Sequence, residues 1–350
     1  MSASEGRTVF GPSAAAAQLE ASKAFAKDVM AEAGIPTAAS RTFQDLTAAL
    51  AYVDRHVEPL VVKASGLAAG KGALVCVTRA EAAGAVRAML GDRAFGDAGA
   101  TVVVEDFLVG EEISVLAVTD GRDLELLPVS QDHKRLLEGD SGPNTGGMGA
   151  YSPVAVATPT VLERTRREVL EPALEEMRRR GTPFTGVLYA GLMVDATDTP
   201  WVVEFNCRLG DPETQVVLPL VSGGLTDALW GVARGEGVRP VAWRAGEASV
   251  TTVLASRGYP DHPEKGAEIA IPSRLPPGVT VFHAGTARGA DGVLRVNGGR
   301  VLNVTAVAPS FAEAQRLSRE TADAIQFEGK IFRRDIGWRE VRRREVAETR

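Results

Sequence analysis

Apolar and polar positions follow a helical period in several stretches of the chain. Ser13 is a plausible N-cap for a long helix that Gly34 ends, and Thr78 with Glu81 forms a capping box for a later one. The helical period predicts helices over residues 13–34, 45–56, 78–90, 159–180, 225–233 and 311–325.

Runs of β-branched and apolar residues predict strands between these helices. The runs cover residues 60–63, 73–77, 101–108, 113–118, 124–129, 184–194 and 201–206. The last two flank a turn at 195–200, so we expect them to form an antiparallel hairpin. From Ser249 onward glycine and proline interrupt shorter strands, at residues 250–254, 279–282, 293–296 and 301–307. This change in character predicts a separate β-rich domain that begins between residues 236 and 248.

The strand at 201–206 carries the most distinctive chemistry. Residues two apart in a strand share a face, so Glu204, Asn206 and Arg208 are expected to project together, with Val203 and Phe205 on the packed side. A carboxylate and an amide oxygen suit Mg²⁺, and an arginine beside them suits an anion. The alternative is a half-buried strand with a surface salt bridge.

Two other strands end in groups suited to a nucleotide. Lys63 precedes a small-residue loop from Gly66 to Gly72, which contains Lys71 and suits a flap over phosphates. The loop lacks the Walker pattern, and alone it also fits a flexible hairpin. The backbone near Asp106 and Leu108 can bond a purine and Glu112 a ribose, although acidic residues at strand ends are often merely solvated.

Residues 130–151 form the longest stretch without a periodic pattern. An irregular loop of about 20 residues within a compact domain is more often functional than passive. Its glycines allow close approach to a ligand, and its polar side chains supply contacts. The alternative is a mobile surface loop. His133 lies here without metal-ligand spacing, so we predict a structural role for it.

The composition indicates an ordinary globular protein and bears on which partners and which compartment to expect. The chain is 45% hydrophobic and 24% charged, with a net charge of −6, so nothing indicates a nucleic-acid partner. Two cysteines form no disulfide framework or zinc pattern. No signal peptide or apolar run near the ~20 residues of a membrane helix is visible. We therefore expect a cytoplasmic protein without a membrane or nucleic-acid partner.

Longer sequence words identify a family. They are Phe10-Gly-Pro-Ser, Leu19-Glu-Ala-Ser-Lys23, the run 62–72, Ser130-Gln-Asp-His-Lys-Arg135, the run 142–153, the run 204–214, Phe282-His-Ala-Gly-Thr286, Asn297-Gly-Gly-Arg300 and Asp335-Ile-Gly-Trp338. Together they resemble the phosphoribosylamine–glycine ligase family of the ATP-grasp superfamily, over residues 10 to about 340.

The resemblance implies an α+β ATP-grasp fold, with two subdomains clamping ATP, followed by a small β-rich domain. It implies a leader at residues 1–12, an ATP-grasp domain at 13–240 with its smaller lobe at about 48–120, and a C-terminal domain at 241–345. The implied reaction joins glycine to 5-phosphoribosylamine in purine biosynthesis. It consumes ATP with Mg²⁺ or Mn²⁺ and passes through a glycyl phosphate.

Site residues carried over from the family fall into four groups. ATP is expected to contact Lys63, Gly70, Lys71, Gly72, Glu105, Asp106, Leu108 and Glu112. The metal ligands are expected to be Glu204 and Asn206. Catalytic roles are expected for Asp132, Lys134 and Arg208. The remaining substrate contacts are expected at Asn144, Thr145, Gly146, Gly147, Met148, Asp211 and Glu213.

The chain departs from the family pattern in two respects. Family members normally begin with a Rossmann-like domain, and we expect this chain to start after it, because residues 1–8 cannot replace a domain of ~100 residues. A truncated sequence, a separate N-terminal chain, or an ATP-binding remnant without full turnover would each account for this. Many ATP-grasp enzymes also carry an acidic metal ligand before the Glu-x-Asn pair, where this chain has Gly191 and Leu192. Asp195 is the nearest carboxylate and an uncertain third ligand.

Overall fold

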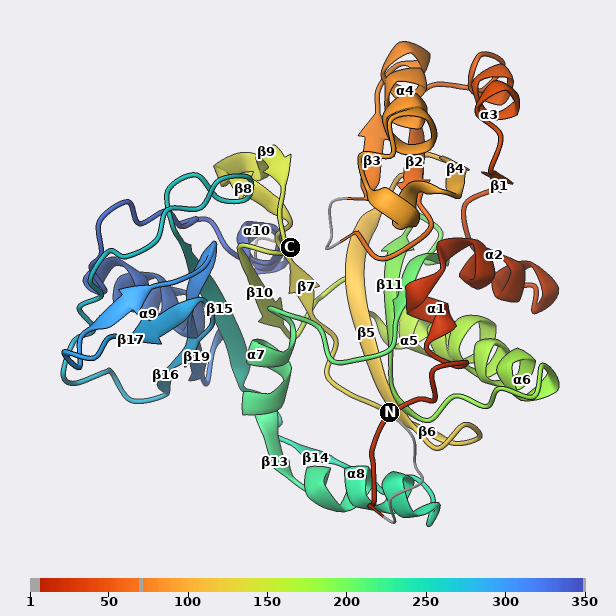
Figure 1. The fold of residues 1–350 in the computed structure, drawn as a ribbon. Helices are drawn as coiled ribbons and strands as arrows, with labels where there is room; N and C mark the ends of the chain where they lie inside the picture. Colours follow the sequence, from red (N-terminus) through yellow and green to blue (C-terminus); the bar gives the residue numbers. More distant parts are fainter. Residues whose placement is uncertain (1–6, 69–71, 349–350) are drawn as a thin grey trace. The chain divides into compact units, whose positions relative to one another are not determined.

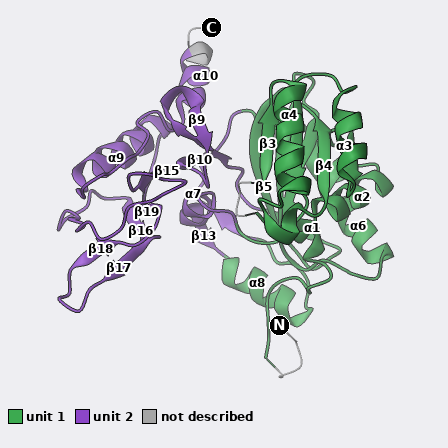
Figure 2. Ribbon diagram, turned by 45° about the horizontal axis from the view of Figure 1, so that its top comes forward, with its two compact units in different colours: residues 1–126, 156–209, 224–240 green, residues 127–155, 210–223, 241–350 purple. Residues whose placement is uncertain are grey.

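The computed structural model describes residues 7–68 and 72–348 (Figure 1). The contacts divide the chain into two compact units (Figure 2). Unit 1 comprises residues 1–126, 156–209 and 224–240, and unit 2 comprises 127–155, 210–223 and 241–350. The chain therefore passes between the units several times, and the predicted contiguous domains at 13–240 and 241–345 stay a prediction.

The smaller sheet of unit 1 is antiparallel. Its strands, in spatial order, are β1 (Ser40–Phe43), β4 (Val102–Asp106), β2 (Leu60–Ala64) and β3 (Ala73–Cys76). Its helical segments are α3 (Leu46–Val53), α4 (Arg79–Val86), the π-helical turn η2 (Arg87–Gly91) and the 3-10 turn η3 (Gly96–Gly99). Asp45 caps α3, and Thr78 caps α4 as the capping box at Thr78 and Glu81 predicts. A core that includes Leu60, Val62, Val86 and Met89 joins α3 and α4 to this sheet.

The larger sheet of unit 1 contains the predicted hairpin. Its strands, in spatial order, are β12 (Pro200–Asn206), β11 (Gly186–Val194), β5 (Glu111–Thr119) and β6 (Leu124–Leu126). The helices of this part are α1 (Gln18–Ala21), α2 (Lys23–Glu32), α5 (Pro159–Thr165), η5 (Arg166–Leu170), α6 (Glu171–Arg179) and α8 (Leu225–Arg234). The predicted continuous helix from 13 to 34 is wrong, because extended backbone at Ser22 separates α1 from α2. The Ser22 hydroxyl caps α2 by accepting from Phe25 N.

Unit 2 is built on a five-stranded antiparallel sheet. Its strands, in spatial order, are β16 (Val279–His283), β19 (Arg300–Ala308), β15 (Ala248–Ala255), β10 (Gly149–Ser152) and β7 (Gln131–Asp132). Two-stranded ribbons pair β8 (Arg135–Leu137) with β9 (Ser141–Asn144), β13 (Val221–Gly223) with β14 (Ala242–Trp243), and β17 (Thr286–Arg288) with β18 (Leu294–Val296). The helical segments are η4 (Glu138–Asp140), α7 (Thr214–Val217), η6 (Leu218–Leu220), α9 (Phe311–Ala324) and α10 (Trp338–Glu348).

The segment at 130–151 is not the structureless loop that the sequence predicts. It contains β7, β8, β9 and β10, and β10 pairs with β15 from Gly149 opposite Thr252 to Ser152 opposite Ser249. The predicted strands and the helix after Ser249 are confirmed as β15, β16, β18, β19 and α9. Among the described residues, no helix has the length and apolar character needed to cross a membrane.

Candidate active site

The β11–β12 hairpin presents Glu204 and Asn206. Asn206 pairs with Tyr189, Phe205 with Ala190 and Glu204 with Gly191, after which the register shifts. Phe205 is buried, whereas Glu204 and Asn206 are partly exposed, so the expected shared face is present. The prediction that Val203 lies on the packed side is wrong. The register shift leaves it outside the ladder and partly exposed, and its carbonyl accepts a hydrogen bond from Lys63 Nζ at 2.9 Å.

A buried cluster of charges joins the two sheets of unit 1. Glu105 lies 2.8 Å from Lys63 Nζ through one oxygen and 3.1 Å from Lys27 Nζ through the other. Lys27 also donates to Thr37 Oγ1 at 2.8 Å, and Thr37 donates to the Val202 carbonyl at 2.7 Å. Two lysines therefore occupy the Glu105 carboxylate.

Lys23 is a candidate site residue to which the sequence reasoning assigned no role. It begins α2, and its ammonium interacts with the charges of Glu204, Lys63 and Glu105. Burial lowers its pKa, which Glu204 partly offsets. Lys23 lies in the family word Leu19-Glu-Ala-Ser-Lys23, which marked it as a residue of interest. Its neighbour Glu204 lies about 180 residues further along the chain, so the sequence alone could not identify the groups around Lys23.

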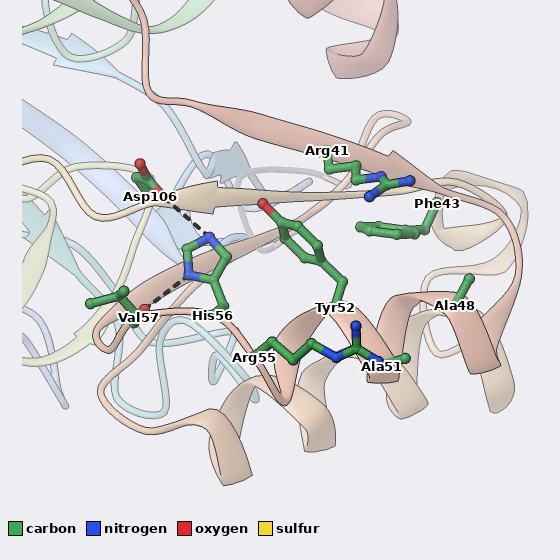
Figure 3. A pocket seen from close by; sticks show the side chains of 9 residues that line it. All are labelled: Arg41, Phe43, Ala48, Ala51, Tyr52, Arg55, His56, Val57 and Asp106. Carbon is green, nitrogen blue, oxygen red and sulfur yellow. Dashed lines mark hydrogen bonds and ion pairs between the residues drawn. The ribbon is translucent and has the colours of Figure 1, made fainter.

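Asp106 turns its side chain toward α3. Its carboxylate lies 3.1 Å from His56 Nε2 and lines a cavity of about 430 Å³ (Figure 3). The guanidinium of Arg41 lies over the rings of Phe43 and Tyr52, at 5.7 and 5.8 Å from their centroids. The Asp106 N–H also donates to the Ala39 carbonyl at 2.9 Å, so this amide is already occupied in this arrangement.

The other predicted ATP contacts are placed less completely. Leu108 is half-buried, and Glu112 is half-buried on β5 opposite Met193. Gly72 accepts from Ala64 N at 2.7 Å, and a side chain at Gly72 would come within 2.6 Å of Ala68 Cβ. Gly70 and Lys71 lie outside the described residues.

Arg208 lies just past the end of β12, beside Asn206. Its Nε donates to Glu20 Oε1 at 2.9 Å, and one terminal nitrogen is 3.5 Å from Asn206 Oδ1. The second Glu20 oxygen accepts from Cys207 N at 2.8 Å. Glu20 therefore holds the Arg208 guanidinium next to the Asn206 side chain, which we expect to bind metal. The guanidinium itself stays largely exposed.

Asp195 does not belong with Glu204 and Asn206. Its oxygens accept from Trp201 Nε1 at 2.8 Å, Thr197 N at 2.8 Å and Thr199 N at 3.0 Å, so it stabilises the hairpin turn. The turn lies at the other end of β12, roughly 20 Å from Asn206 along the strand. The described residues contain no group of three His, Cys, Asp or Glu side chains suited to a metal. Glu204 and Asn206 supply two hard oxygen donors, which suits a Mg²⁺ ion whose other ligands are phosphate oxygens and water.

Unit 2 brings together the predicted substrate residues on both sides of Arg300. Arg300 donates to the Gly146 carbonyl at 2.6 Å and to both oxygens of Asp211, at 3.2 and 3.1 Å. Gly146 N donates to Tyr259 Oη at 2.9 Å. Gly147 has a φ of +108°, and a side chain there would lie 2.5 Å from Pro212 Cδ. Arg300 therefore fixes this loop. It belongs to the sequence word Asn297-Gly-Gly-Arg300, from which no role for it was predicted.

The remaining predicted residues of unit 2 differ in exposure. Asp132, Lys134 and Thr145 are half-buried, and Asn144 is exposed. Thr145 donates to the Lys134 carbonyl through its amide at 2.7 Å and its hydroxyl at 2.9 Å. Met148 is fully buried and Glu213 is nearly so. Both residues therefore support the loop at 144–147 from within unit 2.

Comparison with known proteins finds similar sequences over almost the whole chain. The family model described as phosphoribosylglycinamide synthetase, ATP-grasp (A) domain, matches residues 21–214, and the C domain of the same family matches 249–339. A phosphoribosylamine–glycine ligase of Ralstonia nicotianae is 50% identical over 342 residues, which cover 97% of this chain and 80% of the relative.

Solved structures give the same result. A phosphoribosylamine–glycine ligase from Thermotoga maritima superposes with a TM-score of 0.86 at 40% identity, covering 95% of this chain and 83% of that one. A biotin carboxylase domain from Hydrogenobacter thermophilus has a TM-score of 0.70 at 17% identity, over 94% of this chain and 71% of that one, and shares the fold alone.

Proposed function

The chain belongs to the phosphoribosylglycinamide synthetase family, and from this we propose how its own residues carry out the family's reaction. The fold is the α+β ATP-grasp fold. The enzyme is a C–N ligase of purine biosynthesis that joins glycine to 5-phosphoribosylamine and converts ATP to ADP and phosphate. Which residues bind each substrate is our proposal.

Lys63 and Lys23 are proposed to hold the ATP phosphates. The Lys63 ammonium pairs with Glu105 and is tied to the β12 backbone through the Val203 carbonyl, and the Lys23 ammonium interacts electrostatically with Glu204 and Lys63. Glu204 and Asn206 would hold Mg²⁺ or Mn²⁺, which would neutralise charge on the phosphate oxygens when bound. Lys71 and Gly70, with Gly72, stay a prediction for the phosphate flap.

Adenine recognition is assigned to backbone groups after β4. The Glu105 carboxylate is engaged by Lys63 and Lys27, and the Asp106 carboxylate by His56. The Asp106 N–H donates to the Ala39 carbonyl, so the main-chain groups beyond it, toward Leu108, would bond the purine edge, with Glu112 accepting from ribose hydroxyls.

The acyl-transfer step needs an anion holder and an acceptor site. The glycine carboxylate attacks the γ-phosphorus and ADP leaves, which gives glycyl phosphate. The phosphoribosylamine nitrogen then attacks the glycyl carbon, the amine loses a proton, and phosphate leaves. Arg208, oriented by Glu20, would hold the carboxylate and then the acyl phosphate. Asp132 and Lys134 would contact the amine substrate, and the Asn144–Gly147 loop and Asp211 would line its pocket.

A cytoplasmic location is also part of the proposal. Cys76 and Cys207 are both free thiols, which suits a reducing compartment. The substrates are small molecules, and a separate chain that supplies an N-terminal domain stays a prediction.

The observation that carries these assignments is the shared face of Glu204 and Asn206 next to the buried lysines. The test is phosphate and ADP release with ATP, Mg²⁺, glycine and freshly generated phosphoribosylamine. We expect Glu204→Gln to lower kcat by about 100-fold or more, beyond the 10–100-fold typical of groups that only orient a ligand. Asp195→Asn is the matched control, because it changes a carboxylate of the same hairpin that faces the turn.

Two results would contradict the proposal. Wild-type protein that releases no phosphate in a glycine- and phosphoribosylamine-dependent manner would contradict the activity. Equal losses in the Glu204 and Asp195 variants would contradict the metal assignment but leave the activity intact.

A further inference from the structure

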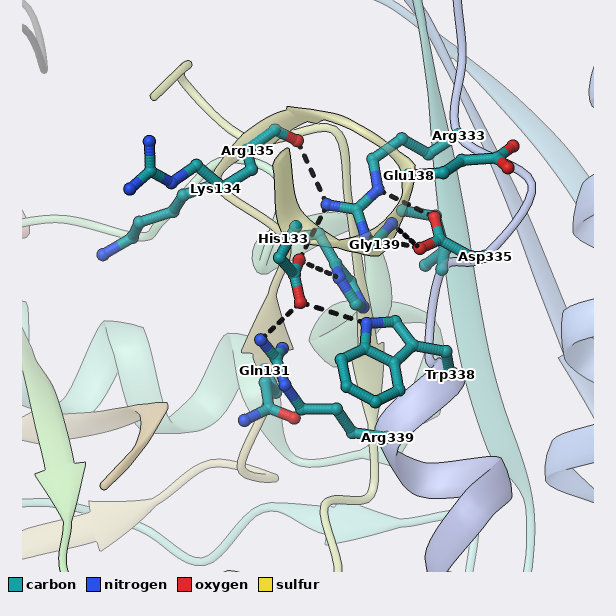
Figure 4. A network of polar contacts seen from close by, with 12 residues as sticks. Gln131, His133, Lys134, Arg135, Glu138, Gly139, Arg333, Asp335, Trp338 and Arg339 are labelled. Atoms are coloured by element: carbon teal, nitrogen blue, oxygen red, sulfur yellow. Dashed lines mark hydrogen bonds and ion pairs between the residues drawn. The ribbon is translucent and has the colours of Figure 1, made fainter. Parts of the chain in front are cut away.

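A buried arginine joins two distant segments of unit 2. Arg333 is 1% exposed, and its Nε and one terminal nitrogen each donate to a different oxygen of Asp335 at 2.8 Å (Figure 4). The other terminal nitrogen donates to Asp140 Oδ1 at 2.9 Å and to the Arg135 carbonyl at 3.1 Å. The guanidinium therefore connects the segment after β7 with the segment before α10.

Asp140 and Asp335 extend this connection in both directions. Asp140 Oδ2 accepts from Arg339 at 2.6 Å and from Trp338 Nε1 at 3.1 Å. Asp335 Oδ2 also accepts from Gly139 N at 2.9 Å. We call Arg333, Asp335, Asp140 and Arg339 the C-terminal clamp.

His133 adds a neutral contact between the same two segments. Its Nε2 accepts from Gly337 N at 2.8 Å, so the proton of the neutral ring is on Nδ1, which lies 3.6 Å from Asp140 Oδ1. Burial lowers the pKa of His133, with Arg333 acting in the same direction and Asp140 against it. The imidazole is buried and its Nε2 is occupied by Gly337 N, so it serves as a fixed structural contact between the two segments.

These contacts fix the residues on either side of His133. Asp132 is held in β7 opposite Ala150, and the Lys134 carbonyl accepts twice from Thr145. Figure 4 shows the side chains of Lys134 and Arg135 extending away from the clamp. The clamp thus fixes the backbone and leaves the Lys134 side chain directed elsewhere.

We propose that Arg333 and Asp140 are positioning residues for the amine substrate, acting through the backbone that carries Asp132 and Lys134. This inference rests on the proposed function. Arginine suits the task, since its planar fork bonds Asp335 with two nitrogens and reaches Asp140 with the third.

The expected effect is specific to one substrate. Without the clamp, residues 132–145 would lose a fixed conformation, and binding phosphoribosylamine would have to order them, which lowers affinity. The residues proposed to bind ATP belong to unit 1, and no clamp residue does. Loss of the clamp should therefore raise the KM for phosphoribosylamine while the Kd for ATP changes little.

The test uses Asp140→Asn, Arg333→Lys and Arg339→Gln in the full chain. Asparagine keeps the shape of Asp140, and Arg339 is partly exposed, so these two variants test the clamp even if Arg333→Lys fails to fold. Asp291→Asn is the matched control, because Asp291 pairs with Arg295 in unit 2 without touching the clamp. Steady-state kinetics gives the KM for each substrate, and calorimetry gives the Kd for ATP.

We expect a rise of about 10-fold or more in the KM for phosphoribosylamine, with the ATP Kd within about twofold of wild type. Asp291→Asn should match wild type in both. An unchanged KM in the folded clamp variants, or an equal loss in ATP binding, would overturn the inference. Wild-type protein without ligase activity would instead count against the proposed function.

Discussion

Replacing Glu105 with glutamine should destabilise unit 1 and weaken ATP binding together. Glu105 lies within 2.8 and 3.1 Å of two ammonium groups, and the side chains of all three residues are no more than 8% exposed. Glutamine keeps the shape and one acceptor oxygen but removes the countercharge. Lys27 and Lys63 would then be buried without a carboxylate partner.

The size of the effect follows from this burial. Breaking a buried ion pair by removing one partner costs about 3–5 kcal/mol, and the retained acceptor in glutamine favours the lower end, ~3 kcal/mol. For a unit of this size each kcal/mol lowers the Tm by about 2–4 °C, so a fall of about 6–12 °C is expected. The ATP Kd should rise about 10-fold, because Lys63 also loses the carboxylate that orients it.

The pH dependence gives the prediction a second readout. Burial lowers the Lys27 pKa and Glu105 raises it, so glutamine should lower that pKa further. Between the folded pKa and the unfolded value of 10.5 the unfolded chain binds more protons, so stability rises with pH there. The Tm deficit of Glu105→Gln should therefore shrink as the pH is raised from 7 toward 10.

Calorimetric melting with and without ATP measures these quantities. Glu58→Gln is the control, because Glu58 pairs with Arg79 on the surface of the same lobe and should shift the Tm by about 2 °C or less. A Glu105→Gln deficit no larger than the control, or one that stays constant from pH 7 to 10, would refute the reasoning.

Three further predictions concern other parts of the site. Gly147→Ala should lower the Tm and raise the KM for phosphoribosylamine, because alanine is strained at a φ of +108° and would meet Pro212; wild-type kinetics would contradict this. Burial raises the Asp140 pKa, but neighbouring groups that include Arg333 and Arg339 hold it below its usual range. The free energy of unfolding, measured in urea, should therefore fall less for Asp140→Asn than for wild type as the pH drops below ~4. Parallel curves of this free energy against pH would contradict the prediction. Arg208→Lys should lower kcat with little change in the ATP Kd, since lysine cannot bond Glu20 and an acyl phosphate as a fork; an unchanged kcat would exclude this role.

The hairpin could be predicted from the sequence because alternation and turn residues are local signals. The strand that carries Glu204 and Asn206 is confirmed, as is the cap at Thr78. The bulge at Val203 could not be predicted, since a bulge is defined by the register of the partner strand.

The charge cluster of unit 1 could not be predicted for a different reason. Lys27, Glu105 and Val203 come from elements separated by tens of residues, and a lysine in an amphipathic helix usually faces solvent. Only the packed sheets show that Lys27 is 7% exposed and paired. The same limit applies to Arg300, whose partners Gly146 and Asp211 lie far away in sequence.

The short strands of 130–151 gave no sequence signal, because β7 to β10 are two to four residues long. Such strands are too brief for an alternating pattern. β8 pairs with β9 and β7 with β10 inside the segment, and β10 also pairs with β15, about 100 residues further along the chain. The long loop was therefore a reasonable expectation from polarity and glycine content, but tertiary pairing overrode it.

The pairing of β10 with β15 can form only late in the synthesis of the chain. Gly149 leaves the ribosome about 100 residues before its partner Thr252, an interval of about 5–20 s at common elongation rates. During this time the edge of β10 that pairs with β15 in the folded sheet has no partner strand, whereas its other edge can already pair with β7. The nascent chain therefore passes through a stage at which one edge of residues 149–152 is open to pairing with other strands.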